Sequence, residues 1–322
     1  MYSYFVGIDI SKYFFDASVE VRGRVKHRQF SNAQVGFDAF IRWCKSLNLE
    51  NVHVCMEATG AFWFELAGFL YDKLEAVSVV NPVCIKRFAQ SELKRTKTDK
   101  VDAGIIARFC EKMSPSLSQP AAEEVQALQK LVRRLHDLTK MRQQERNRLS
   151  SRSLDDYTSK SVERMLAHLD SEIARIRKQI ERLYKQHPQL REKRELLMTI
   201  PGVGPETANV VLTEVPHLEL FESAKQLAAF AGLAPREFRS GSSIRGRTRM
   251  SKTGRSRLRQ ALYLPSVSSR SCNPVIQVFC DRLLEHGKAP MKVVGAAMRK
   301  LLHIIFGVLK SGKPFDERIA WA

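Results

Sequence analysis

The chain has 322 residues, a length typical of about two domains, and its 44% hydrophobic content is enough for a buried core. Lysine and arginine number 53 against 34 acidic residues, and the net charge of +19 favours a polyanionic partner, most often nucleic acid, over a generally basic soluble protein. The longest apolar run, residues 301–309, is far shorter than the ~20 residues of a bilayer span, and residues 1–12 lack a signal-peptide pattern, so we expect a soluble, cytoplasmic protein with no membrane partner.

Residues 1–120 are predicted to form an α/β domain. Apolar runs and alternation predict strands at 4–10, 14–21 and 25–30, which would form an antiparallel meander. Helices at 34–47 and 62–74 then alternate with strands at 51–56 and 76–80. A turn at Thr59-Gly60 follows the first of these two strands, and Asn81-Pro82 ends the second. A last helix, capped by Thr98, is predicted to run to about Lys112. This order is typical of a layered α/β domain.

Residues 121–190 are predicted to form two long helices in an antiparallel hairpin. Apolar residues recur there with a heptad-like spacing that predicts a narrow stripe on each helix. They are Leu128, Leu131, Leu135 and Leu138, then Leu169, Ile173, Ile176, Ile180 and Leu183. The hairpin is either a spacer or an arm for oligomerisation, because each stripe must be buried against something.

Residues 191–322 are predicted to be mostly helical. The stretch Ile200-Pro-Gly-Val-Gly204 resembles the turn of a helix-hairpin-helix element. In such a turn Gly202 and Gly204 would expose backbone N–H groups that can bind a phosphate. The alternative is a tight turn between helices that binds no ligand.

A basic run follows between residues 236 and 259, with nine basic residues and one acidic residue in 24 positions. Its glycines and serines predict that much of it is a loop. Because so large an excess of positive charge favours a counter-charge, we expect contacts with nucleic-acid phosphates. The candidate contact residues are Arg236, Arg239, Arg245, Arg247, Arg249, Lys252 and Arg255.

Four acidic residues in the first 120 positions are candidate metal ligands: Asp9, Glu57, Asp99 and Asp102. Asp9 lies inside an apolar strand, where a carboxylate is costly unless it is paired or bound to a metal. Glu57 follows a strand, and Asp99 and Asp102 share one face of a helix. Together they could hold two Mg²⁺ ions for phosphoryl transfer.

Simpler roles exist for some of these acids. Asp99 could be an N-terminal helix charge, and Asp102 could pair with Arg95 or Lys97. Solvent exposure is the simpler explanation for Asp16 and other nearby acids.

Ser240-Gly-Ser-Ser243 lies inside the basic run and offers hydroxyl groups beside positive charge. A serine in such a place could attack a phosphodiester. From spacing alone, a flexible loop is the favoured interpretation, and the absence of a nearby histidine argues against a hydrolase-type triad. The six cysteines have no C-x-x-C spacing, which argues against a zinc site or a disulfide framework.

Taken as an ordered set, these motifs resemble the insertion sequence 110 family of transposases, the bridge-RNA-guided recombinases, over nearly the whole chain. The set comprises Gly7-Ile-Asp9, Met56-Glu57-Ala-Thr-Gly60, Lys97-Thr-Asp99-Lys-Val-Asp102-Ala103, Ile200-Pro-Gly-Val-Gly204, Phe230-Ala-Gly-Leu-Ala-Pro235 and Ser240-Gly-Ser-Ser-Ile-Arg-Gly246.

The resemblance implies a RuvC-like, ribonuclease-H-type domain at 1–120, in which Asp9, Glu57, Asp99 and Asp102 bind metal. It implies a coiled-coil hairpin at 121–190 and a transposase domain at 191–322, in which Ser240 is the nucleophile that forms a 5′-phosphoserine link. Ser242 and Ser243 are the alternatives.

The implied cofactor is Mg²⁺. The implied partners are donor and target double-stranded DNA, a structured noncoding bridge RNA, and further copies of the chain in a homodimer or homotetramer. The implied location is the cytoplasm of a bacterium, at the nucleoid.

Two other functions compete with this one. A RuvC-like, Mg²⁺-dependent endonuclease of the junction-resolving type would use the acids but hydrolyse DNA without a covalent intermediate. A non-enzymatic RNA- or DNA-binding protein would have only structural acids, and Asp9 inside its apolar strand weighs against that.

Overall fold

The computed structural model describes residues 2–58, 62–74, 76–92, 99–150, 154–236, 239–240, 244–245 and 249–320, without the side chains of residues 99–101, 239–240, 244–245 and 319–320. The chain forms two compact units, Met1–Pro120 and Ala121–Ala322. Both the predicted hairpin and the predicted C-terminal domain lie in the second unit.

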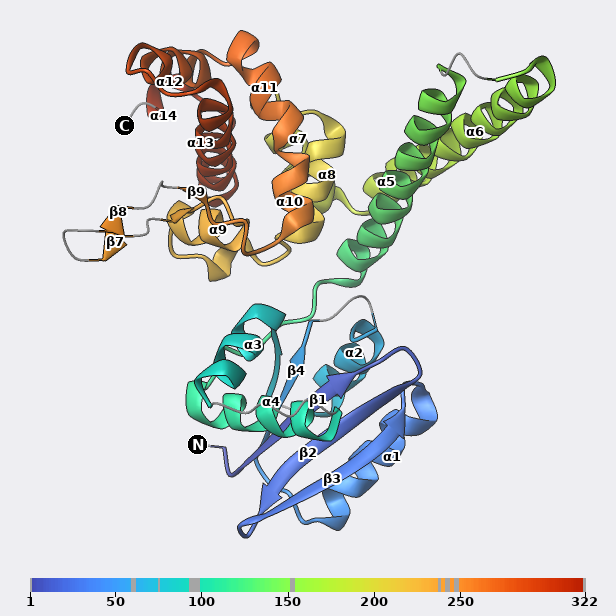
Figure 1. Ribbon diagram of the computed structural model, residues 1–322, viewed down its shortest axis with the longest axis vertical. Coiled ribbons are helices and arrows are strands. Elements are labelled where there is room, and N and C mark those ends of the chain that lie inside the picture. The colour runs from blue at the N-terminus through green and yellow to red at the C-terminus, as the bar shows by residue number, and fades with distance from the viewer. Residues whose placement is uncertain are drawn as a thin grey trace. The chain divides into compact units, whose positions relative to one another are not determined.

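The first unit contains a five-stranded mixed sheet with the order β3-β2-β1-β4-β5 (Figure 1). Strand β1 pairs antiparallel with β2 and parallel with β4, and β4 pairs parallel with β5. The predicted meander and the α/β class are confirmed. The strands are β1 (Tyr4–Ile10), β2 (Phe14–Val21), β3 (Arg24–Ser31), β4 (Val52–Glu57) and β5 (Ala76–Val80).

Each face of the sheet buries its own apolar core. Alternate β1 residues Val6, Ile8 and Ile10 belong to a core that includes Phe37 and Phe40 of α1 (Gln34–Ser46) and side chains of α2 (Phe64–Lys73). The opposite face carries a smaller core beneath α3 (Pro82–Ser91) and α4 (Asp99–Met113). Because side chains alternate along a strand, Gly7 and Asp9 belong to the α4 face.

Helix α3 is absent from the sequence-based prediction, which treated Asn81-Pro82 only as the end of a strand. The same two residues begin the helix. The Asn81 side chain accepts a hydrogen bond from the Val83 backbone N–H at 2.9 Å, and Pro82 occupies the first turn. Asparagine as the cap and proline directly after it are both typical of a helix start.

Gly7 allows α4 to lie directly against β1. A β-carbon on Gly7 would stand 2.1 Å from the Ala103 carbonyl oxygen and 2.2 Å from the Ala107 nitrogen. Both atoms are backbone, so they cannot move aside as a flexible side chain would. The missing side chain therefore sets the distance between α4 and the strand that carries Asp9.

We expect Gly7→Ala to destabilise the first unit by about 3 kcal/mol or more, because the added methyl group would force backbone apart. Chemical denaturation of the full chain measures this. Gly68→Ala is the control, since Gly68 lies in α2 with open space around its Cα and the change should be neutral or slightly stabilising. An unchanged unfolding midpoint for Gly7→Ala would contradict the close approach.

The second unit is mostly helical, as predicted. Helices α5 (Glu123–Leu149) and α6 (Asp156–Gln186) form the expected hairpin, and Leu128, Leu135, Ile173 and others are buried along its seam. The described residues between positions 235 and 250 include four two-residue strands. The remaining helices are α7 (Pro188–Met198), α8 (Pro205–Glu214), η1 (Leu218–Leu220), α9 (Ala224–Phe230), α10 (Ser256–Ala261), α11 (Tyr263–Cys272), α12 (Pro274–Glu285), α13 (Pro290–Ser311) and α14 (Glu317–Ala320).

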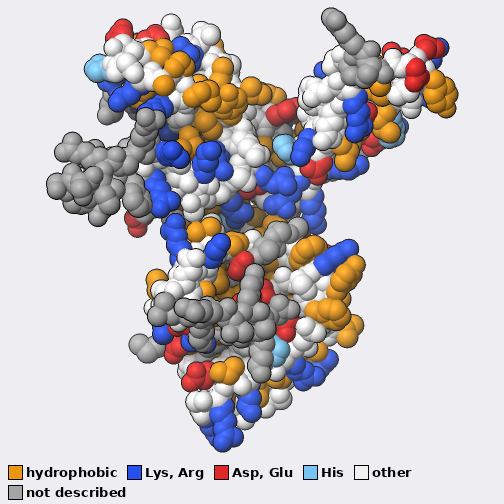
Figure 2. Space-filling view, in the orientation of Figure 1, with side chains coloured by type: hydrophobic (Ala, Val, Ile, Leu, Met, Phe, Trp, Pro, Cys, Tyr) orange, Lys and Arg blue, Asp and Glu red, His pale blue; other side chains and the backbone are white. Residues whose placement is uncertain are grey.

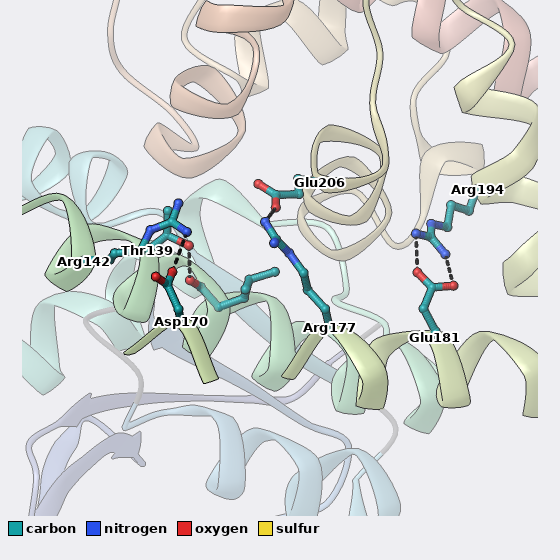
Figure 3. A network of polar contacts seen from close by, with 8 residues as sticks. Thr139, Arg142, Asp170, Arg177, Glu181, Arg194 and Glu206 are labelled. Atoms are coloured by element: carbon teal, nitrogen blue, oxygen red, sulfur yellow. Dashed lines mark hydrogen bonds and ion pairs between the residues drawn. The ribbon is translucent and has the colours of Figure 1, made fainter. Parts of the chain in front are cut away.

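Ion pairs join α6 to the helices that follow it (Figure 3). Arg177 of α6 contacts Glu206 of α8 at 2.5 Å. Arg194 of α7 donates two hydrogen bonds to Glu181 of α6, at 2.6 and 2.9 Å, and its guanidinium lies 4.4 Å from the centre of the Tyr184 ring. These contacts fix α7 and α8 relative to the hairpin.

Hydrogen bonds from Arg194 hold the pKa of Glu181 below its ordinary value. The stability from this pair is therefore present above the ordinary glutamate pKa of about 4.3 and is lost as the pH falls through the lower folded pKa. We expect Glu181→Gln to lower the stability by about 1 kcal/mol or less at neutral pH, because Glu181 is half exposed, and to remove this part of the acid sensitivity.

Thermal unfolding of the full chain between neutral and acidic pH measures the difference. Glu163→Gln, an exposed change on the same helix, is the control. An acid sensitivity that is the same in Glu181→Gln as in the unchanged protein would show that the pair contributes nothing.

None of the helices that the structure describes is both long and apolar enough to cross a membrane.

Candidate active site

Asp9 and Glu57 lie side by side at the carboxyl ends of two neighbouring parallel strands. Ile8 of β1 is in register with Met56 of β4, so Asp9 and Glu57 each follow a paired residue and lie on the same face. Both are partly buried. This is the α4 face of the sheet, and the two carboxylates lie at the ends of strands whose interiors are apolar.

Helix α4 brings its first turn to the same end of the sheet. The Cys110 thiol contacts the His53 carbonyl at 3.7 Å near the start of β4, while Ala103 lies over Gly7. The helix therefore runs antiparallel to β1, and its first turn, with Asp99 and Asp102, points toward the carboxyl ends of β1 and β4. Three distant stretches of sequence meet there.

Within the residues that the structure describes, no three side chains of Asp, Glu, His or Cys are close enough to hold a metal ion. The Asp99 side chain lies outside that description, although its backbone is in α4. Thr98, the predicted cap of this helix, and Thr59-Gly60, the predicted turn after β4, also lie outside it.

Asp16 is a carboxylate that the sequence-based prediction wrongly assigned to solvent. It is 7% exposed and lies directly opposite Asp9 in the β1–β2 register. Its two oxygens contact His27 Nε2 at 2.8 Å and Gln29 Nε2 at 3.0 Å, both from β3. Because Asp16 already has these partners, we assign it a structural role beside Asp9. Only the strand register could have revealed it.

The Ser240 backbone lies at the end of a two-stranded ribbon. Strand β7 (Arg239–Ser240) pairs antiparallel with β8 (Ile244–Arg245), and Ser240 is opposite Ile244. Gly241, Ser242 and Ser243, which connect the two strands, lie outside the described residues, as does Arg247. The predicted loop is thus partly strand, and Ser240 is the last residue before the connection.

Arginines occupy opposite positions in this region. Arg236 of β6 (Pro235–Arg236) pairs with Arg249 of β9 (Arg249–Met250), and Arg239 is opposite Arg245. Like charges directly across a sheet are destabilising. The described pair Arg236–Arg249 therefore favours an anionic partner that offsets the repulsion. Figure 2 shows further Lys and Arg side chains on this face of the second unit, over α9 and around the start of α5.

The apolar stretch Phe230–Pro235 anchors the residues that follow β9. Backbone N–H groups of Ser251, Lys252 and Arg255 donate to carbonyls of Ala234, Gly232 and Phe230 at 2.8–3.0 Å. Arg236, Arg249 and Lys252 are exposed beside this anchor. Arg255 is also exposed, but its guanidinium has an acidic neighbour, because it lies 3.9 Å from the buried Glu214 carboxylate.

The hairpin at Gly202 packs against α11. A β-carbon on Gly202 would lie 2.0 Å from the Ser269 hydroxyl, and the Pro201 carbonyl accepts hydrogen bonds from Ser269 and Asn273. The positive φ of 92° at Gly202 is a second reason why this position favours glycine. Gly204 precedes α8 with open space around it. Phosphate binding by these two glycines remains a prediction.

Comparison with known proteins identifies the family. A DEDD transposase model of the IS110 group matches residues 6–158, and a model described as the IS116/IS110/IS902 transposase family matches residues 194–280. The pilin gene-inverting protein of Moraxella lacunata is 36% identical over 319 residues, which are 98% of both chains. The chain belongs to the IS110 family of transposases.

Two further relatives are similar over much of the chain. The pilin gene-inverting protein of Moraxella bovis is also 36% identical over 98% of both chains. The transposase for insertion sequence element IS1328 of Yersinia enterocolitica is 24% identical over 80% of this chain and 81% of its own. The first matched family segment spans the α/β unit and continues into the helical hairpin, so it contains all four candidate acids.

Proposed function

We propose that this IS110-family transposase cuts and rejoins DNA by phosphoryl transfer, with the four acids holding Mg²⁺ and Ser240 as the nucleophile. The observation that carries the proposal is the position of Asp9 and Glu57 on neighbouring strand ends, beneath the first turn of α4. The pilin gene-inverting relatives extend the possible reactions to inversion of a DNA segment.

The donor set suits Mg²⁺ in kind. Asp9, Glu57 and Asp102 offer carboxylate oxygens, the ligands that this hard cation prefers, and Asp99 would complete the set. When bound, Mg²⁺ would supply positive charge that stabilises the attacking and leaving oxygens of a phosphodiester. The protein's own contribution is to hold the acids at one end of the sheet through the Gly7–α4 contact.

The serine step requires no further reactant, because each bond that forms replaces one that breaks. The Ser240 hydroxyl attacks phosphorus, an Oγ–P bond forms and the P–O3′ bond breaks. The departing O3′ leaves as a hydroxyl, which takes up the proton that the serine loses. Attack by a 3′-hydroxyl on the 5′-phosphoserine reverses these changes and joins a new pair of DNA ends.

The two short strand pairs β6–β9 and β7–β8, together called the basic ribbon, are the proposed nucleic-acid contact. The opposed pairs Arg236–Arg249 and Arg239–Arg245 place four cations beside Ser240 in the chain. Arg247, Lys252 and Arg255 would add to them, and Gly202 and Gly204 would offer backbone donors. In this proposal a bridge RNA pairs with donor and target DNA, and homodimers or homotetramers assemble through the α5–α6 hairpin at the bacterial nucleoid.

Metal removal tests the chemistry directly. The purified protein is incubated with plasmid that carries the element's native flanks and with RNA transcribed from those flanks, in Mg²⁺ or in EDTA. We expect strand cleavage and protein-linked DNA ends in Mg²⁺ and neither in EDTA. Cleavage that is equal in EDTA would contradict the metal site, and Mg²⁺-dependent nicks without protein-linked ends would instead support a hydrolytic endonuclease.

A further inference from the structure

A pocket of about 280 Å³ lies within the second unit, lined by residues of α5, α8, α10 and α11 and apart from the basic ribbon. Its polar lining includes Arg133 and His136 of α5 and Arg257 and Gln260 of α10. Gln129 of α5 donates a hydrogen bond to the Thr213 carbonyl of α8 at 2.9 Å. This bond ties two of the pocket walls together.

Positive charge in and around the pocket exceeds the negative charge that faces it. The guanidiniums of Arg255 and Arg257 act electrostatically on Arg133, and so does the buried carboxylate of Glu214. Burial also lowers the pKa of Arg133. Glu206, the other acid in the lining, contacts Arg177. Among the described residues, four guanidiniums in and around the pocket (Arg133, Arg177, Arg255 and Arg257) face two carboxylates, an excess that an anion would offset.

The remaining wall of the pocket is apolar. Val132, Val210, Leu264 and Pro265 line it, and the Leu264 side chain is 73% exposed. An apolar wall beside guanidinium groups suits a ligand that has both a flat hydrophobic part and a negative charge. A nucleotide combines these two properties in its base and its phosphate.

We propose that this pocket binds one nucleotide, with the phosphate at Arg133 and Arg257 and the base against Val210, Leu264 and Pro265. In this arrangement the Gln260 amide donates a hydrogen bond to the edge of the base or accepts one from it. The nucleotide comes from an unstacked position in a nucleic-acid strand. The inference rests on the proposed action on nucleic acid, but not on the acids or on Ser240.

Binding of a fluorescein-labelled oligothymidylate to the full chain, in EDTA, tests the charged half of the pocket. We expect Arg133→Gln and Arg257→Gln each to weaken binding about tenfold and to lower the salt slope by about one unit. Arg134→Gln is the matched control, because Arg134 is exposed on the same helix and does not line the pocket. Equal weakening by Arg134→Gln and Arg133→Gln would overturn the proposal.

Arg133→Lys keeps the charge and guards against a folding defect, since it should restore most of the binding and the circular dichroism of the unchanged protein. An Arg133→Lys variant that folds normally but binds as weakly as Arg133→Gln, with the same salt slope, would overturn a phosphate role for Arg133. Because the assay measures binding without added metal and does not depend on strand cleavage, failure of the proposed chemistry would leave these binding curves unchanged.

An oligonucleotide with abasic positions tests the apolar half. We expect Leu264→Ala to weaken binding of the intact strand several-fold but not that of the abasic strand. Competition by thymidine 5′-monophosphate that requires Arg133 would show that a free nucleotide also enters, whereas competition by intact strands alone would limit the ligand to a strand. Inorganic phosphate that competes as well as the mononucleotide would overturn the role of the base.

Discussion

Ser240→Ala is expected to abolish covalent attachment of DNA to the protein and to lower recombination about a thousandfold or more, because no other step supplies the serine oxygen that forms the bond to phosphorus. The full chain is expressed beside its native flanking DNA and lysed in hot detergent. DNA that remains attached is then measured. Recombinant junctions are counted in the same cells.

Ser268→Ala is the matched control, since Ser268 is an exposed serine of α11 in the same unit. It should retain attachment. Attachment that persists in Ser240→Ala would move the nucleophile to Ser242 or Ser243, which the corresponding single variants would then identify. Ser240 ends the described part of its strand, so removing one hydroxyl there should not disturb the β7–β8 pairing.

Asp9→Asn is expected to lower strand cleavage about a thousandfold while DNA binding stays within about twofold, because a neutral amide no longer attracts the metal but keeps the shape of the side chain. Cleavage is measured on plasmid with native flanks, and binding is measured separately in EDTA. A loss of both activities together would indicate a folding defect rather than loss of a ligand.

Asp72→Asn provides the matched control, as Asp72 is an exposed carboxylate of α2 in the same unit. Its cleavage rate should not change. Cleavage that survives in Asp9→Asn would mean that Asp9 does not bind the metal. In that case Asp16, its neighbour across the sheet, would become the acid to test next.

The local pattern of the sequence determined most of the elements. An apolar run predicted β1 and alternating apolar residues predicted β2 at the observed residues, and the heptad-like stripes predicted the α5–α6 hairpin. These features are readable because each depends on neighbours within a few turns or pleats. Helix α3 was missed because Asn81-Pro82 has the same composition whether it ends a strand or begins a helix.

The ordered motifs also determined the family. The order of the acids, the glycine hairpin and the serine loop can be recognised in the sequence without knowing any distance between them. Two family models and relatives that span nearly the full chain confirm it. The roles of Asp9, Glu57, Asp99, Asp102 and Ser240 remain predictions from that resemblance, and the side chains of Asp99 and Ser240 also lie outside the described residues.

Only the tertiary structure decided which side chains meet. Strand register placed Asp16 opposite Asp9, and the direction of α4 brought its first turn to the ends of β1 and β4. Packing of both α5 and α10 against α8 likewise brought Arg133 to the same pocket as Arg257, over a hundred positions later in the chain. Sequence spacing reports neighbours along the chain, whereas charge repulsion and ligand binding depend on distance through space.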